Sequence, residues 1–148
     1  MVEQRRSPLA HLADRMRAAG ALAELPFITM VNLRVAPGSE AAQRIETTLG
    51  ARLPQQCGDT SHTIAWLGPD EWLVLSEADA PGLVAELRVA LGADPGSVVD
   101  VSANRTTIEL GGPSAREVLE KGCPLDLHPR AFGPGKAVST TVGPVPVL

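Results

Sequence analysis

Two cysteines and two histidines occur in pairs of matching spacing. Cys57 and His62 are separated by four residues, and so are Cys123 and His128. Two thiolates and two imidazoles can together hold a tetrahedral Zn²⁺ ion. Structural zinc sites usually contain a closely spaced cysteine pair, however, and these two cysteines lie far apart in the sequence. We therefore predict no metal site in this chain.

Cys123 and His128 could instead form a nucleophile and its general base. Pro124 lies between them, and the sequence offers no evident third group that would orient the histidine. A buried and unreactive thiol is the better interpretation of Cys123.

The carboxylates form no credible acid-base pair. Asp70 and Glu71 are adjacent in a turn, so their side chains point apart. Asp100 lies between two valines of a predicted strand, where it could accept hydrogen bonds from the following turn, for example from Asn104. Arg105 follows that turn, and we expect it to be exposed or paired with Asp100. We predict no catalytic residue.

The sequence also lacks the usual means of binding a nucleotide or a flat ring. Gly111-Gly112-Pro113 has neither the spacing nor the lysine of a phosphate-binding loop. The chain has two tryptophans, two phenylalanines and no tyrosine, whereas flavin and pterin sites usually stack the ring on aromatic side chains. We therefore predict that the chain binds no cofactor of its own.

The length, composition and net charge of the chain indicate an ordinary globular protein. A chain of 148 residues, 44% of them hydrophobic, can bury one core, either as one domain or as two half-domains that share it. The net charge of −4 argues against nucleic acid as a partner. Charged residues after Arg5-Arg6 exclude a twin-arginine export signal, and no segment approaches the roughly 20 apolar residues of a membrane span. We expect a cytoplasmic protein with no membrane partner.

Hydrophobic periodicity predicts a first βαββαβ unit, the element order of the ferredoxin-like fold. Val31, Leu33 and Val35 alternate with polar residues, which is typical of a strand with one wet face. Ser39 and Gly50 are good start and stop signals for the helix that follows. The predicted elements are strand 28–35, helix 39–50, strands 63–67 and 72–75, helix 81–91 and strand 98–101.

A second unit is predicted to follow and to remain incomplete. Its elements are strand 106–110, a helix that opens at Gly112-Pro113, strand 136–142 and a strand that begins at Val145. Ser114 and Glu117 have the spacing of a capping box at the start of the helix. A further helix and strand would be needed to finish the unit. We expect either further residues or a partner chain to cover its apolar edge.

These patterns divide the chain into three parts. Residues 1–27 form an N-terminal amphipathic helical arm, residues 28–102 the first unit, and residues 103–148 the incomplete second unit packed on the first. The predicted fold class is α+β.

Four stretches of the sequence carry a family resemblance. They are Arg6-Ser-Pro-Leu-Ala-His-Leu, Pro26-Phe-Ile-Thr-Met-Val-Asn-Leu, Trp66-Leu-Gly-Pro-Asp-Glu-Trp-Leu-Val and the long run over residues 98–130. Together they resemble the gamma subunit family of heterotetrameric sarcosine oxidase, from about Arg6 to the last residue. That family is distantly similar to the folate-dependent aminomethyltransferases, which implies two ferredoxin-like βαββαβ units as in their folate-binding fold.

The resemblance implies a complex that oxidatively demethylates sarcosine to glycine, passes the one-carbon unit to tetrahydrofolate and produces hydrogen peroxide. It implies alpha, beta and delta subunits as partners. FAD, FMN, NAD, tetrahydrofolate and zinc would be bound by those other subunits. The gamma chain would then be a companion without a cofactor or a catalytic residue.

The similarity to aminomethyltransferases also implies an alternative, a free-standing folate-binding protein of that type. Asp100-Val101-Ser102 and the later Gly112-Pro113 match elements that both families share. The catalytic aspartate of the aminomethyltransferases lies in an Asn-Ala context. Asp79 is the only possible equivalent here, and it follows Ser76-Glu77-Ala78 instead.

Five residues are our candidates for contacts with partner subunits, namely Trp66, Trp72, Arg105, His128 and Phe132. The two tryptophans flank one turn, and tryptophan is favoured at interface hot spots. A position in the buried core is the alternative for both tryptophans.

Overall fold

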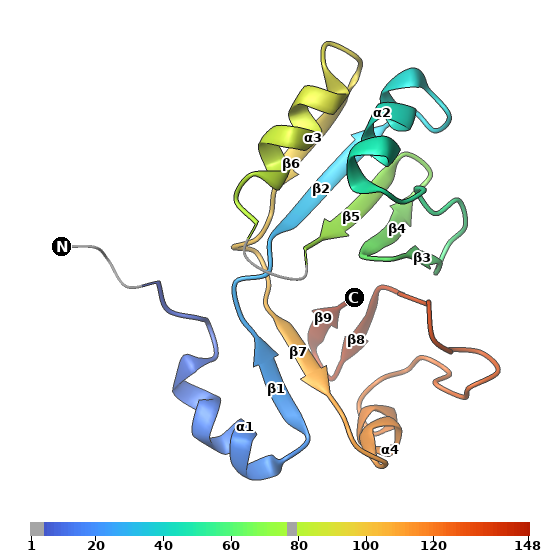
Figure 1. The fold of residues 1–148 in the computed structure, drawn as a ribbon. Coiled ribbons are helices and arrows are strands. Elements are labelled where there is room, and N and C mark those ends of the chain that lie inside the picture. The colour runs from blue at the N-terminus through green and yellow to red at the C-terminus, as the bar shows by residue number, and fades with distance from the viewer. Residues whose placement is uncertain (1–4, 77–79) are drawn as a thin grey trace.

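The computed structural model describes residues 5–76 and 80–148. Figure 1 shows a large sheet with helices against it, and a smaller layer of strands and short helices below. In chain order the elements are η1 (Ala10–Leu12), α1 (Ala13–Ala19), β1 (Leu22–Leu25), β2 (Met30–Val35), α2 (Glu40–Leu49), β3 (Thr60–Ser61), β4 (Ile64–Gly68), β5 (Glu71–Leu75), α3 (Leu83–Leu91), β6 (Gly96–Asp100), β7 (Thr107–Leu110), α4 (Ala115–Glu120), β8 (Thr140–Val142) and β9 (Val145–Val147).

The large sheet has the strand order β3-β4-β5-β2-β6, and all its neighbouring strands are antiparallel. Its elements β2, α2, β4, β5, α3 and β6 follow the order predicted for the first unit, with the short β3 added. The fold is therefore mixed α+β with antiparallel sheets, as the sequence predicts. We call residues 30–100 the body of the molecule.

The alternation along β2 decides which face of the sheet the helices cover. Val31, Leu33 and Val35 are buried against α2 and α3, while Asn32 and Arg34 lie on the opposite face. Ile45 of α2 and Leu87 of α3 are fully buried in the same cluster. Burial of large aliphatic side chains from all three elements makes this cluster the main core.

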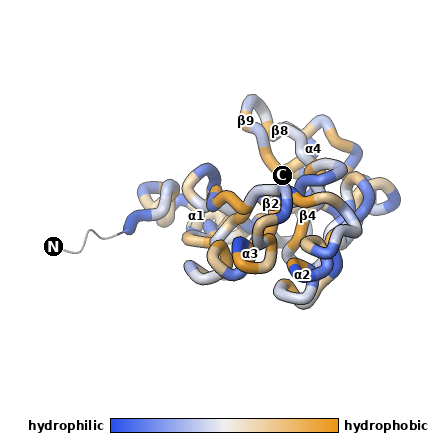
Figure 2. Tube along the Cα trace, turned by 90° about the horizontal axis from the view of Figure 1, so that it is seen from above, coloured by the Kyte–Doolittle hydropathy of each residue, from blue (hydrophilic) through white to orange (hydrophobic). Residues whose placement is uncertain are grey.

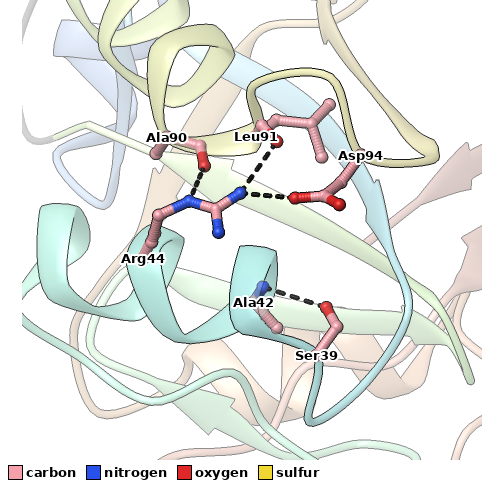
Figure 3. Close-up of polar contacts among 6 residues, drawn as sticks. All are labelled: Ser39, Ala42, Arg44, Ala90, Leu91 and Asp94. Carbon is pink, nitrogen blue, oxygen red and sulfur yellow. Dashed lines mark hydrogen bonds and ion pairs between the residues drawn. The ribbon is translucent and has the colours of Figure 1, made fainter.

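Polar contacts fix the two helices to each other. The Ser39 hydroxyl accepts a hydrogen bond from the Ala42 amide (3.1 Å), which caps α2 as predicted. From α2, the Arg44 guanidinium donates to the carbonyls of Ala90 (2.8 Å) and Leu91 (3.1 Å) and pairs with Asp94 (2.5 Å; Figure 3). Arg44 thus satisfies free carbonyls at the end of α3, where a positive charge is also favourable.

The remaining strands form two small sheets, and here the structure differs from the prediction. The strand predicted at 106–110 is observed as β7, which pairs with β1 from the N-terminal arm. The strand β1 lies in the segment predicted as a helical arm, and hydrophobic periodicity gives no signal for it. Of the strand predicted over 136–142, only β8 is observed; it pairs with β9, while Lys136 forms an isolated antiparallel bridge with Asp59. These strands therefore do not join into one second sheet within the described residues.

The predicted capping box of the next helix is also wrong. The Ser114 side chain makes no capping hydrogen bond, and its backbone is not in the extended conformation that an N-cap residue adopts. The chain turns at Gly112, whose φ of 87° requires glycine, and α4 begins only at Ala115.

The C-terminal segment is tied to the body through residues 58–60. Asp59 forms an ion pair with Lys136, the Thr60 amide donates to the Gly135 carbonyl (3.1 Å), and the Ala137 amide donates to the Gly58 carbonyl (3.0 Å). Ala137 also packs against a second, smaller apolar cluster on the sheet face opposite α2 and α3. Both faces of the sheet are thus at least partly covered.

The elements outside the body extend away from it. We call them the outer elements; they are η1, α1, β1, β7, α4, β8 and β9. In the view of Figure 2, α1 and the β8–β9 hairpin lie at different sides of the molecule, each apart from α2. None of the helices in the described part of the chain is long and apolar enough to cross a membrane.

Candidate functional site

Two chain crossings connect the body to the outer elements. The chain passes from β1 into β2 and from β6 into β7, so the paired strands β2 and β6 continue as the paired strands β1 and β7. A cleft of about 510 Å³ lies at this junction. We call it the arginine cleft; its polar and aromatic lining is Arg5, Arg6, Phe27, Asp100, Ser102 and Arg105.

A hydrogen-bonded turn forms one wall of the arginine cleft. Asp100 accepts hydrogen bonds from the Ser102 hydroxyl (2.6 Å) and amide (2.9 Å), and the Ser102 hydroxyl accepts one from the Met30 amide (2.9 Å). The hydrogen bonds from the Ser102 side chain and backbone hold the pKa of Asp100 below its usual value. The Asp-x-Ser sequence therefore joins the end of β6 to the start of β2.

Part of this arrangement was predicted from the sequence. Asp100 accepts hydrogen bonds from the following turn, as expected, but its partner is Ser102 and not Asn104. The Asn104 amide instead donates to the Val101 carbonyl (2.9 Å). Arg105 is exposed, which is one of the two placements predicted for it.

Phe27 forms another wall of the arginine cleft. It has a φ of 62°, which is rare for a bulky residue other than glycine. The Arg5 guanidinium carbon lies 4.8 Å from the centre of its ring, within the range of a cation–π interaction. Backbone conformations of this kind persist only where the surrounding structure holds them. They often occur at binding sites. No motif or residue spacing in the sequence marks Phe27 as a site residue.

Glu24 of β1 fixes the N-terminal segment next to the cleft. Its carboxylate accepts hydrogen bonds from the Ser7 hydroxyl (2.6 Å), the Thr106 hydroxyl (2.8 Å) and the Leu9 amide (3.3 Å). Desolvation raises the pKa of Glu24, but these hydrogen bonds outweigh it and keep the pKa below its usual value. Glu24 thus joins three separate segments of the chain.

The arginine cleft offers exposed charged groups to a binding partner. Arg6 and Arg105 are both exposed, and neither forms an ion pair within the described residues. Asp100 is the carboxylate of the cleft, and its low pKa keeps it ionised at neutral pH. No histidine or cysteine belongs to the described lining.

The two tryptophans lie in the body, away from the arginine cleft. Trp66 and Trp72 are directly opposite each other on β4 and β5 and therefore share one face of the sheet. Trp72 is only 1% exposed, and its indole nitrogen donates to the Pro54 carbonyl (2.8 Å). Trp72 is thus a core residue in this chain, which is the alternative placement given for the two tryptophans. Trp66 is partly buried and packs against the same core.

The other predicted interface residues belong to the C-terminal segment. His128 is exposed, and its Nδ1 accepts a hydrogen bond from the Arg130 amide (3.2 Å). Phe132 is half-buried. Neither lines the arginine cleft. Of the five predicted residues, the structure therefore places only Arg105 at this site.

The two cysteines differ in their surroundings. Cys57 is exposed, and Cys123 is half-buried with its sulfur 3.9 Å from the Thr140 hydroxyl. Among residues 5–76 and 80–148, no three histidine, cysteine or acidic side chains are grouped so that they could bind a metal ion. Asp79, the only possible equivalent of the aminomethyltransferase aspartate, lies outside the described residues.

Comparisons with known proteins agree with one another. The sequence profile of the sarcosine oxidase gamma subunit family matches residues 34–144. The sarcosine oxidase gamma subunit of an Arthrobacter species is 47% identical over 154 residues, which cover 97% of this chain and 75% of that protein. The gamma subunit of Corynebacterium strain U-96 is 45% identical over 156 residues, covering 97% and 76%.

A solved structure gives the same result. It is the heterotetrameric sarcosine oxidase from Corynebacterium sp. U-96 in complex with pyrrole 2-carboxylate. One of its chains is 42% identical to this chain and superimposes with a TM-score of 0.91, covering 98% of this chain and 80% of that chain.

Proposed function

Because the chain belongs to the sarcosine oxidase gamma subunit family, we propose that it serves as the gamma subunit of a heterotetrameric sarcosine oxidase. The observation that carries this proposal is the match over nearly the whole chain, in sequence and in fold, to one chain of such a complex. Its partners would be the alpha, beta and delta subunits, in the cytoplasm.

The complex would oxidise the N-methyl group of sarcosine. Two electrons would pass from the substrate through flavin to oxygen, which is reduced to hydrogen peroxide. The carbon released would be taken up by tetrahydrofolate, and glycine would remain. FAD, FMN, NAD, tetrahydrofolate and zinc would be bound by the other subunits, and we assign none of these chemical steps to the gamma chain.

This assignment is supported by what the arginine cleft contains. Its described lining offers arginines and one hydrogen-bonded carboxylate, a set suited to contact with another molecule and not to proton transfer. The gamma chain would therefore contribute to assembly. We also propose that residues 28–102 and 103–148 correspond to the two ferredoxin-like units of the aminomethyltransferase fold, with residues 1–27 as an arm.

Co-expression tests this function. The chain would be produced with the alpha, beta and delta subunits of its own organism, and the complex purified through a tag on the alpha subunit. We expect one gamma chain per complex and sarcosine-dependent peroxide formation. A gamma chain that is folded but absent from the purified complex would contradict the proposal. Tight binding of tetrahydrofolate by the chain alone would favour the aminomethyltransferase-like alternative.

A further inference from the structure

We propose that the arginine cleft binds an acidic segment of a partner subunit, an inference that rests on the proposed function. The juxtaposition that carries it is that of Arg6 and Arg105, which lie far apart in the sequence and line the same cleft. Both side chains are exposed, and neither has an ion-pair partner among the described residues.

The charge of this cleft contrasts with that of the whole chain. The chain has a net charge of −4, yet three guanidinium groups gather here around a single carboxylate. Arg5 lies over the Phe27 ring, which leaves Arg6 and Arg105 as the groups best placed to meet an added negative charge. Arginine binds carboxylates in a two-pronged geometry and is enriched at protein interfaces.

A polypeptide fits the surroundings better than a small anion such as phosphate. Asp100 lies in the same cleft and would repel a compact, multiply charged anion, whereas the charges of an acidic segment are spaced along a chain. Apolar surface also borders the charged groups, because Leu25 lines the cleft and is 39% exposed. A partner with an apolar residue beside its acidic ones would cover Leu25 as well.

The cleft is held in shape before any partner arrives. Ser102 links Asp100 to the Met30 amide, and Glu24 links the N-terminal segment to Thr106. Binding would therefore require little rearrangement of the backbone, which lowers the entropic cost of association.

Charge reversal in the co-expressed complex tests this proposal. The double variant Arg6→Glu/Arg105→Glu should leave the melting temperature of the isolated chain unchanged, because neither side chain makes an ion pair within the described residues. We expect the fraction of gamma chain in the purified complex to fall at least tenfold. The matched control is Arg15→Glu, an exposed arginine outside the cleft, which should assemble like the unaltered chain.

A second measurement identifies the partner group directly. Arg105→Lys keeps the charge and supplies an amine, which a water-soluble carbodiimide couples to a carboxylate that it contacts. We expect a cross-link to an aspartate or glutamate of another subunit, located by mass spectrometry, and none from Arg15→Lys. A complex that assembles normally with Arg6→Glu/Arg105→Glu would overturn the proposal and leave the proposed function intact.

Two further results of these experiments separate failure of the proposed function from failure of the acidic-segment proposal. If even the unaltered gamma chain stays out of the complex, the proposed function itself fails. If inorganic phosphate raises the melting temperature of the unaltered chain but not of the double variant, and both assemble equally, the cleft is a small-anion site and the acidic-segment proposal is wrong.

Discussion

The body and the outer elements of this molecule are stabilised in different ways. In the described chain, every fully buried apolar side chain except Leu127 lies within residues 30–98. Most of the large apolar residues that remain exposed in the described chain lie outside the body, on β1, β7, α4 and the C-terminal hairpin with the residue after it; they are Leu22, Leu25, Ile108, Val118, Val145 and Leu148. The body is therefore held by its own core, whereas the outer elements are held by hydrogen bonds and short pairings.

This contrast agrees with two different roles, in which the body supplies a stable fold and the outer elements contact the partner subunits. A part with its own core can fold independently of a partner, because burial of apolar surface is the main source of stability. A part that leaves apolar surface exposed next to a cleft of arginines is suited to contact with another chain. The arginine cleft lies at the boundary between the two parts.

We expect the largest loss of stability from a substitution in the core of the body. Leu33→Ala would remove a fully buried side chain from the main core and should lower the free energy of unfolding by about 2–5 kcal/mol. Val118→Ala is the control in the outer part, since Val118 is 52% exposed, and it should change stability by less than about 0.5 kcal/mol. Urea denaturation of the full chain measures both. Equal losses would show that the two parts do not differ in packing.

A smaller effect is expected at the contact between α2 and α3. Arg44→Ala would remove the donors to the Ala90 and Leu91 carbonyls and the partner of Asp94, and it should cost about 1–2 kcal/mol. Arg52→Ala, an exposed arginine that makes no such contact, is the matched control. Thermal unfolding followed by circular dichroism compares the two variants. No difference between them would mean that Arg44 does not stabilise the helix pair.

We expect the smallest change in stability from a substitution of Glu24 in the outer elements, and this change should depend on pH. The pKa of Glu24 is lowered in the folded chain, so its ionised form stabilises the fold. This contribution is fully present above the unfolded pKa, near 4.5, and is lost as the pH falls through the lower folded value. The stability difference between the unaltered chain and Glu24→Gln should therefore shrink between pH 6 and pH 3. A difference that grows on acidification would contradict the hydrogen bonds assigned to Glu24.

The sequence predicts the body better than the outer part, for a physical reason. In β2, the alternation of Val31, Leu33 and Val35 reports directly which face is buried, and Ser39 and Gly50 mark the ends of α2. The strand β1 has no such signal, because its burial depends on β7, far away in the sequence. Its residues Leu22 and Leu25 remain exposed.

The candidate site was predictable only in part for the same reason. Asp100 and Arg105 lie close together in the sequence, and their turn was expected. Arg6 and Phe27 join the cleft through the β1–β7 pairing, which local patterns do not reveal. Conversely, Trp72 was expected at an interface because of its residue type, and its pairing with Trp66 on the helix-covered face places it in the core.

Hydrogen exchange, compared between the isolated gamma chain and the assembled complex, distinguishes the body from the outer elements. We expect the amides of β2 and β5 to exchange slowly in both states, because the body holds its own core. We expect assembly to slow exchange in β1, β7 and the turn at residues 100–106, around the arginine cleft. Unchanged exchange in those segments, with new protection over α2 and α3 instead, would show that the partner subunits bind the body and not the arginine cleft.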